Sequence, residues 1–167
     1  MLFRSQIYRY DLDKGSGDLW FKVNLPLDPG RFEVNQAWFQ SKDGTRVPMF
    51  LLHRKGLKRN PDTPVLLGGY GGFNVSNTPL FSATGVIFAE QGGIFAIVNL
   101  RGGAEFGEAW HEAGMRDRKQ NVFDDFIAAA EYLIREKYTK PSRLAITGGS
   151  NGGLLVGAAL KIGRAHV

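Results

Sequence analysis

The chain has 167 residues, of which 43% are hydrophobic, with a formal net charge of +5 and no cysteine. That length and hydrophobic content favour one folded domain over a disordered segment, and the lack of cysteine excludes disulfides and thiolate metal sites. The positive charge is small and, apart from residues 53–59, is not gathered into a block, so it predicts no nucleic-acid-binding surface. No apolar run approaches the length of a membrane span.

The first predicted element is a hairpin. Polar and apolar side chains alternate over residues 6–12, a polar turn follows, and an apolar strand resumes at residues 19–23. Two prolines and a glycine interrupt any regular element over residues 25–30, so we place a domain boundary there. Because two strands alone are not stable in water, the hairpin suggests the last fragment of a larger β-domain.

A second antiparallel pair begins the main domain. Strands are predicted at residues 32–40 and 47–53, and Asp43-Gly44 in the connection between them is the usual signal of a two-residue hairpin turn. The basic residues that follow, within 53–59, are interpreted as a solvated turn.

From residue 64 onward, apolar strands alternate with helices. The predicted elements are a strand at 64–67, a helix at 80–91, a strand at 94–100, a helix at 121–138 and a strand at 144–147. Strands that are apolar throughout are buried on both faces. This pattern predicts an α/β domain with a mainly parallel sheet, in which the earlier antiparallel pair forms the edge.

The helix at residues 121–138 is the clearest in the chain. Asn121 suits its N-cap, and Asp124 and Asp125 are expected in its first turn, where the helix dipole favours negative charge. We therefore interpret both aspartates as helix-terminal charges rather than catalytic groups. Apolar residues at spacings of three and four predict one buried stripe, made of Phe123, Phe126, Ile127, Ala130, Leu133 and Ile134.

The last predicted strand leads through a tight turn into a helix. The turn fits the pattern G-x-S-x-G with Gly148, Ser150 and Gly152, the nucleophile elbow, in which the serine occupies a strained corner. We expect glycines there because a side chain would collide with the neighbouring strand or helix, and because the corner needs unfavourable backbone angles. Ser150 is the candidate nucleophile, and the amide of Asn151 at the helix N-terminus is the candidate oxyanion donor.

Taken alone, this pattern leaves open a glycine-rich turn that only packs tightly, or a phosphate-binding loop, although no Gly-Lys-Ser/Thr sequence follows. A second glycine-rich loop, G-G-Y-G-G-F at residues 68–73, comes directly after the first buried strand. In α/β-hydrolases the loop after that strand supplies the other half of the oxyanion hole. Two such loops, each at the end of its own strand, favour a hydrolase.

Four segments of the chain carry a family resemblance: GGYGGF at 68–73, NLRGGAEFGEAWH at 99–111, KQNVFDDF at 119–126 and GGSNGG at 148–153. Together they resemble the prolyl oligopeptidase family of serine peptidases, and the match runs from about residue 41 to residue 161. Asn151 after the serine differs from the alanine that is usual in oligopeptidase B and the tyrosine that is usual in dipeptidyl peptidase IV. The resemblance implies an α/β-hydrolase domain with a β-propeller inserted ahead of residue 32, so the hairpin would be propeller or its exit.

The same resemblance implies the roles of individual residues. Ser150 would be the nucleophile, and the amide of Asn151 with the hydroxyl of Tyr70 would hold the oxyanion. Phe73 and the side chain of Asn151 would line a pocket for a proline ring. Without the resemblance, Tyr70 and Phe73 would be interpreted as an ordinary half-buried tyrosine and a core phenylalanine.

The family implies a soluble enzyme that cleaves short proline-containing peptides by acyl transfer. We expect the full-length parent protein, of which this chain would be one part, to be monomeric and either cytoplasmic or periplasmic. No cofactor, metal, nucleic-acid or membrane partner is expected. The alternatives are a non-catalytic α/β-hydrolase-like binding module and another oligopeptidase of the same family.

Both ends of the chain look foreign. Residues 1–5 and 162–167 match translations of a common sequencing-library adapter, so we expect the natural segment to be an internal piece of a longer gene. We assign residues 6–30 to the end of a β-propeller or a linker, and residues 31–161 to the N-terminal part of an α/β-hydrolase catalytic domain.

The acid and the histidine of a catalytic triad are not identified. Hydrolases of this fold place both after the serine in sequence, and only His166, in the suspected adapter, follows Ser150. We interpret His53 and His111 as structural, since a histidine outside a motif seldom performs chemistry. An Asp and a later His beyond residue 161 of the intact gene would support the enzyme over the binding module.

Overall fold

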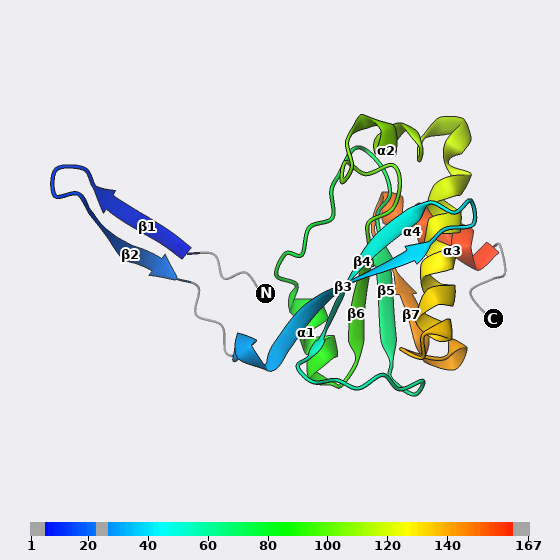
Figure 1. Cartoon of the computed structure of the whole chain (residues 1–167), viewed down its shortest axis with the longest axis horizontal. Helices are drawn as coiled ribbons and strands as arrows, with labels where there is room; N and C mark the ends of the chain where they lie inside the picture. Colours follow the sequence, from blue (N-terminus) through cyan, green and yellow to red (C-terminus); the bar gives the residue numbers. More distant parts are fainter. Residues whose placement is uncertain (1–5, 23–26, 162–167) are drawn as a thin grey trace.

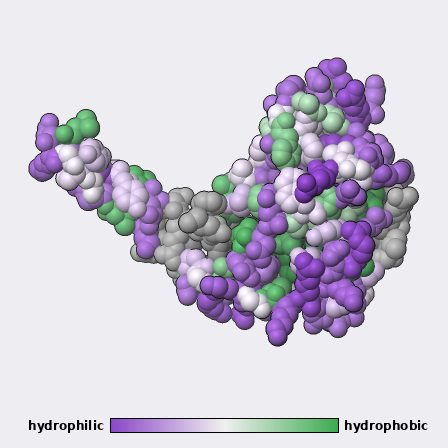
Figure 2. All heavy atoms as spheres, viewed as in Figure 1, coloured by the Kyte–Doolittle hydropathy of each residue, from purple (hydrophilic) through white to green (hydrophobic). Residues whose placement is uncertain are grey.

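The computed structural model describes residues 6–22 and 27–161, and its strands form two sheets (Figure 1). The first is the predicted hairpin, in which β1 (Gln6–Asp11) pairs antiparallel with β2 (Ser16–Lys22). Its apolar side chains are largely at the surface (Figure 2). Leu12, in the turn, is strongly exposed. The suspected adapter residues 1–5 and 162–167, and part of the predicted break at 25–30, lie outside the described residues.

The second sheet has five strands in the order β3-β4-β6-β5-β7. β4 pairs antiparallel with both β3 and β6, whereas β5 pairs parallel with β6 and β7. The antiparallel edge is therefore confirmed, but the sheet is mixed, because its parallel part is limited to three strands. The bounds are β3 Phe32–Gln40, β4 Arg46–Arg54, β5 Val65–Gly69, β6 Ile94–Val98 and β7 Leu144–Thr147.

Helices cover both faces of this sheet. α1 (Ala83–Glu90) packs with Phe32 and Leu52 on one face. α3 (Gln120–Arg135) and α4 (Asn151–Lys161) pack on the other, over the alternate side chains of the same strands. The larger core lies there and includes Met49, Leu51, Val65, Leu67, Ile94, Val98, Phe126, Leu133 and Leu155.

The remaining helical segments are short, and α1 begins later than predicted. The hydroxyl of Ser82 caps α1 by accepting a hydrogen bond from the amide of Gly85 at 3.1 Å, so Leu80 precedes the helix and is exposed. α2 is Glu108–Glu112, and 3₁₀ turns occur at Pro29–Arg31, Arg116–Arg118 and Pro141–Arg143. In the described ranges, no helix is both long and apolar enough to cross a bilayer.

The predicted interpretation of α3 needs correction at its N-terminus. The helix starts at Gln120, so Asn121 is not its N-cap, and the carboxamide of Asn121 instead donates to the carbonyl of Ala113 at 2.9 Å. Neither Asp124 nor Asp125 lies in the first turn, and Asp125 is completely buried. The buried stripe contains the predicted Phe126, Ile127 and Leu133, together with Val122 and Ala129. The predicted Phe123, Ala130 and Ile134 are only half-buried.

Two other features concern exposure. β7 was expected to be buried, yet its residues alternate between half-buried and exposed, because among the described strands it pairs only with β5.

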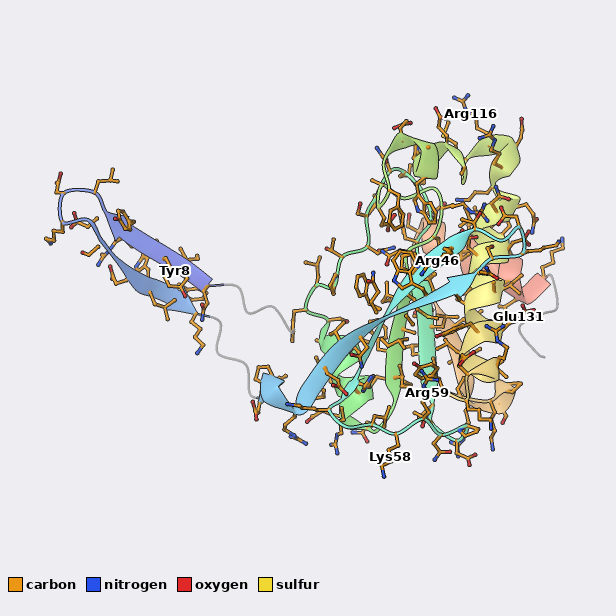
Figure 3. All side chains as sticks on the ribbon, in the orientation of Figure 1. Tyr8, Arg46, Lys58, Arg59, Arg116 and Glu131 are labelled. Atoms are coloured by element: carbon orange, nitrogen blue, oxygen red, sulfur yellow. The ribbon has the colours of Figure 1, made fainter. Side chains whose placement is uncertain are left out.

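The turn after β4 is solvated as predicted, and Lys58 and Arg59 extend from it at the surface (Figure 3). The guanidinium of Arg59 lies over the ring of Tyr138, 4.4 Å from its centroid.

Candidate active site

Ser150 stands at the sharp corner between β7 and α4. It has a φ of +54°, in the left-handed region that non-glycine residues rarely adopt. Its carbonyl accepts hydrogen bonds from the amides of Gly153 at 2.8 Å and Leu154 at 3.2 Å, which start the helix directly after the corner. Ser150 is exposed in the described chain. This geometry is that of the predicted nucleophile elbow.

Two glycines of the motif are required by close backbone contacts. A Cβ atom on Gly148 would lie 2.2 Å from the carbonyl oxygen of Gly152, and one on Gly152 would lie 2.7 Å from the carbonyl oxygen of Gly69. A Cβ atom on Gly149 would meet nothing within 4 Å. The predicted steric reason is thus correct for Gly148 and Gly152, whereas the unfavourable backbone angle belongs to Ser150 itself.

The second predicted loop follows β5 and carries both aromatic candidates. Tyr70 is half-buried, Phe73 is 74% exposed, and their ring centroids lie 6.4 Å apart. The loop turns through left-handed conformations at Gly71, with φ of +62°, and at Phe73, with φ of +54°. A Cβ atom on Gly71 would lie 2.3 Å from a methyl group of Val122, so only glycine lets the loop approach α3 this closely.

The structure brings the two loops together through Asn151. Its carboxamide nitrogen donates a hydrogen bond to the carbonyl oxygen of Tyr70. The same carboxamide packs against Gly72, where a Cβ atom would lie 2.6 Å from that nitrogen. Ser150 and Tyr70, which are 80 positions apart in the sequence, are therefore linked by one residue next to the serine.

Lys119 was not identified as a site residue from the sequence. Its ammonium group donates to the carbonyl oxygen of Gly71 at 2.7 Å and to the carboxamide oxygen of Asn151 at 3.3 Å. Lys119 is half-buried, and this burial lowers the pKa of its ammonium group. The only available signal was its position at the start of KQNVFDDF, a segment used for the family resemblance alone.

Arg101 and Asp125 form a buried ion pair next to Gly102, a residue that contacts the Tyr70 loop. Arg101, just after β6, is 4% exposed, and its guanidinium contacts both carboxylate oxygens of the completely buried Asp125. The adjacent Gly102 packs against the Tyr70 loop, since a Cβ atom on it would lie 2.8 Å from the carbonyl oxygen of Gly71. From its place in the sequence, Asp125 was predicted to be a helix-terminal charge, and no sequence pattern singled out Arg101 as a site residue.

The two described histidines bond to the protein backbone and are not part of the elbow. The Nδ1 atom of His53 lies 2.8 Å from the carbonyl oxygen of Arg54, and the Nδ1 atom of His111 lies 2.8 Å from that of Gly102. His166 lies outside the described residues. Among residues 6–22 and 27–161, no three histidine, aspartate or glutamate side chains are grouped to hold a metal ion.

Comparison with known proteins agrees with this geometry. The model of the prolyl oligopeptidase family matches residues 79–166, a little over half of the chain. The chain belongs to the prolyl oligopeptidase family. In the matched range lie the elbow with Ser150 and Asn151, the Arg101 segment and Lys119, whereas Tyr70 and Phe73 come before it.

Individual members of the prolyl oligopeptidase family cover more of the chain. It is 44% identical over 154 residues to a prolyl endopeptidase of Elizabethkingia miricola, covering 92% of this chain and 22% of that protein. It is 53% identical over 135 residues to prolyl oligopeptidase A of Galerina marginata, covering 80% of this chain and 18% of that protein. The chain therefore spans about a fifth of the length of these relatives.

Solved structures of the family share the fold. A structure from a study of two prolyl endopeptidases superposes with a TM-score of 0.86 at 57% identity, over 92% of this chain and 23% of the other. Prolyl oligopeptidase B of Galerina marginata, in complex with a 25-residue macrocyclization substrate, gives a TM-score of 0.84 at 44% identity, over 92% of this chain and 22% of the other.

Proposed function

We propose that this chain is part of the catalytic domain of a serine peptidase that cleaves short peptides after proline through an acyl-enzyme on Ser150. The observation that carries the proposal is the position of Ser150. It is exposed on a strained corner at the N-terminus of α4, and its neighbour Asn151 is bonded to the Tyr70 loop. The hairpin β1–β2 would be the end of a β-propeller domain of a monomeric parent protein.

In this proposal, the hydroxyl oxygen of Ser150 attacks the carbonyl carbon of the substrate's proline, and negative charge develops on the carbonyl oxygen. The backbone amide of Asn151 and the hydroxyl of Tyr70 donate hydrogen bonds to that oxygen, and the N-terminus of α4 adds a favourable dipole. The leaving amine departs, and water then hydrolyses the acyl-enzyme. A histidine and an acid from the rest of the parent protein would transfer the protons.

Proline specificity is supported by Phe73 and by the relatives. Phe73 is strongly exposed on the same loop as Tyr70, which suits an aromatic side chain that contacts a ligand rather than the core. Proteins 44% to 53% identical to this chain are named prolyl endopeptidase or prolyl oligopeptidase. The carboxamide of Asn151 is already bonded to Tyr70 and Lys119. In a proline pocket, Asn151 would therefore contact the proline ring through the part of its side chain that stays exposed.

The test uses the intact parent protein that contains these residues. We expect it to hydrolyse a chromogenic substrate with Gly-Pro before the scissile bond, and to lose this activity in a Ser150→Ala variant. A fluorophosphonate should label Ser150 in the parent and fail to label the variant. A parent that binds proline peptides but neither cleaves them nor reacts with the fluorophosphonate would instead support a non-catalytic binding module.

The 167-residue chain by itself should have no peptidase activity. Neither histidine of residues 6–22 and 27–161 belongs to the elbow, so neither is placed there to accept the proton of Ser150. Loss of triad members lowers rates by several powers of ten. The measurement is turnover of the same Gly-Pro substrate by the purified chain. Activity that disappears on Ser150→Ala substitution would contradict this prediction.

A further inference from the structure

Lys119 occupies a position where a lysine is unfavourable for the helix that it precedes. It lies immediately before α3, at the N-cap position, and its side chain makes no capping hydrogen bond there. The helix dipole disfavours positive charge at an N-terminus, and Ser, Thr, Asp or Asn would be the usual caps. Its side chain is also partly buried, which disfavours the charged form. Local stability of α3 therefore does not explain this lysine.

The contacts of Lys119 instead join the two halves of the site. The ammonium group donates to the carbonyl of Gly71 in one loop and to the side chain of Asn151 at the start of α4. Asn151 in turn donates to the carbonyl of Tyr70, so two successive carbonyls of the loop are each held by a side chain from another element. Hydrogen bonds with a charged donor are roughly twice as strong as neutral ones, and partial burial protects them from water.

Lys119 also fixes which way the carboxamide of Asn151 faces. An ammonium group can only donate hydrogen bonds, so the oxygen of the carboxamide must point toward it. The nitrogen is then directed at the carbonyl of Tyr70, which can only accept. Without Lys119, the carboxamide could rotate, and the hydrogen bond that ties Tyr70 to α4 would lose its geometric constraint.

The loop that is held in this way needs external restraint. It contains three residues in the left-handed region, Gly71, Phe73 and Asn74, of which the last two are not glycine. Such conformations are retained only where the surroundings over-determine them. A shift of about 1 Å in a group that contacts the transition state can lower a rate by about a hundredfold.

We propose that Lys119 is a positioning residue of the oxyanion site, which holds the Tyr70 loop against α4 so that the Tyr70 hydroxyl and the Asn151 amide converge on one oxygen atom. This inference rests on the proposed function of Ser150, Tyr70 and Asn151. Lys119 itself is not expected to contact the substrate. It acts through the carbonyl of Gly71 and the side chain of Asn151.

The kinetic test compares Lys119→Met with Lys140→Met in the intact parent. Methionine keeps the length and apolar stem of lysine but donates no hydrogen bond, and Lys140 is a suitable control because it makes a surface ion pair with Asp62. We expect Lys119→Met to lower kcat about tenfold or more with a smaller change in KM, because the oxyanion forms only in the transition state. Lys140→Met should leave both constants within about twofold. Active enzyme is counted by fluorophosphonate labelling.

A double-mutant cycle with Tyr70→Phe separates positioning from general support of the fold. If Lys119 acts through the Tyr70 hydroxyl, Lys119→Met should lower kcat much less in the Tyr70→Phe background than in the wild type. Equal reductions in both backgrounds would overturn the proposal. Should Lys119→Met fail to fold, Lys119→Gln, which keeps a neutral donor, takes its place in the same cycle with a smaller expected reduction.

Hydrogen exchange tests, independently of activity, whether Lys119 holds the Tyr70 loop in place. In the parent, the amide of Val75 bonds to Gly72 and that of Asn74 bonds to Gly102, so both report on the loop. Lys119→Met should speed exchange in the segment 70–75 by about fivefold or more relative to Lys140→Met. Unchanged exchange in this segment would overturn the proposal that Lys119 restrains the loop. If the wild-type parent is inactive, the proposed function is refuted. The exchange measurement would then still show whether Lys119 restrains the Tyr70 loop.

Discussion

Arg101 and Asp125 form a buried ion pair that joins the end of β6 to the middle of α3. Their side chains are 5% and 0% exposed, and the Nη2 atom of Arg101 lies 2.6 Å from a carboxylate oxygen of Asp125. The Nε atom lies 3.0 and 3.2 Å from the two carboxylate oxygens, and the backbone amide of Arg101 donates to one of them at 3.2 Å. Because Gly102 contacts the Tyr70 loop, this pair also supports the candidate active site.

Removing the buried carboxylate should destabilise the fold strongly. Asp125→Ala leaves the buried guanidinium of Arg101 with Asp43 as its remaining anionic partner, beside the hydroxyls of Ser41 and Thr45. Loss of one member of a buried pair lowers the free energy of unfolding by about 3–5 kcal/mol. The neighbouring Asp124→Ala is the control, since Asp124 accepts only a surface hydrogen bond from Gln120, and it should change stability by less than about 1 kcal/mol. Urea unfolding measures both. Similar losses for the two variants would contradict the assigned role.

The stability that depends on Asp43 should disappear in acid. Burial disfavours ionisation of Asp43, but hydrogen bonds from Arg101 and Thr45 outweigh it and lower the pKa from 3.8 to about 2. A carboxylate whose pKa is lower in the folded state stabilises the fold above its unfolded pKa, and this contribution is lost as the pH falls toward the folded value. The melting temperature of Asp43→Asn should thus lie below that of the wild type at pH 5, and the gap should narrow from pH 4 to pH 2. A gap independent of pH would show that the charge is not responsible.

Two adjacent glycines of the elbow should differ in their tolerance of a methyl group. In Gly148→Ala the new Cβ atom would collide with the backbone of Gly152, so the corner must shift, and we expect the free energy of unfolding to fall by about 1–3 kcal/mol. Fluorophosphonate labelling of Ser150 in the parent should slow at the same time. Gly149→Ala meets open space and should alter stability by less than about 1 kcal/mol, with labelling preserved. The prediction is wrong if the Gly149 variant is the more damaged of the two.

Tyr70→Phe and Phe73→Ala should have opposite kinetic effects in the parent. The hydroxyl of Tyr70 is expected to meet the carbonyl oxygen fully only when that oxygen becomes negative, so its loss should lower kcat, by about 3 kcal/mol or less in transition-state energy. Phe73 is exposed and would contact the proline ring in ground and transition states alike, so its truncation should mainly raise KM. Both variants are compared on one proline-containing substrate. The assigned roles fail if Tyr70→Phe leaves turnover unchanged while Phe73→Ala abolishes it.

The sequence by itself was sufficient for the elements whose signal is local. β3 has the predicted bounds, and Asp43-Gly44 lies in the turn that follows it, although that connection spans residues 41–45 rather than two residues. The elbow was equally predictable, since Gly148 and Gly152 are needed by contacts within a few residues of Ser150 or with the adjoining strand. Spacing also located α3, although not its first residue, because Asn121 bonds to a distant carbonyl instead of capping the helix.

Only the tertiary structure decided which polar side chains support the site. Asp125 has the sequence position of a helix-terminal charge, yet the turn of α3 on which it lies faces Arg101, whose buried guanidinium requires a partner. Lys119 lies in no recognisable catalytic pattern, and its partners, Gly71 and Asn151, are 48 and 32 positions away. Hydrogen bonds of this kind depend on where α3 packs on the sheet, and hydrophobic periodicity specifies the face of a helix but not the partners of its polar residues.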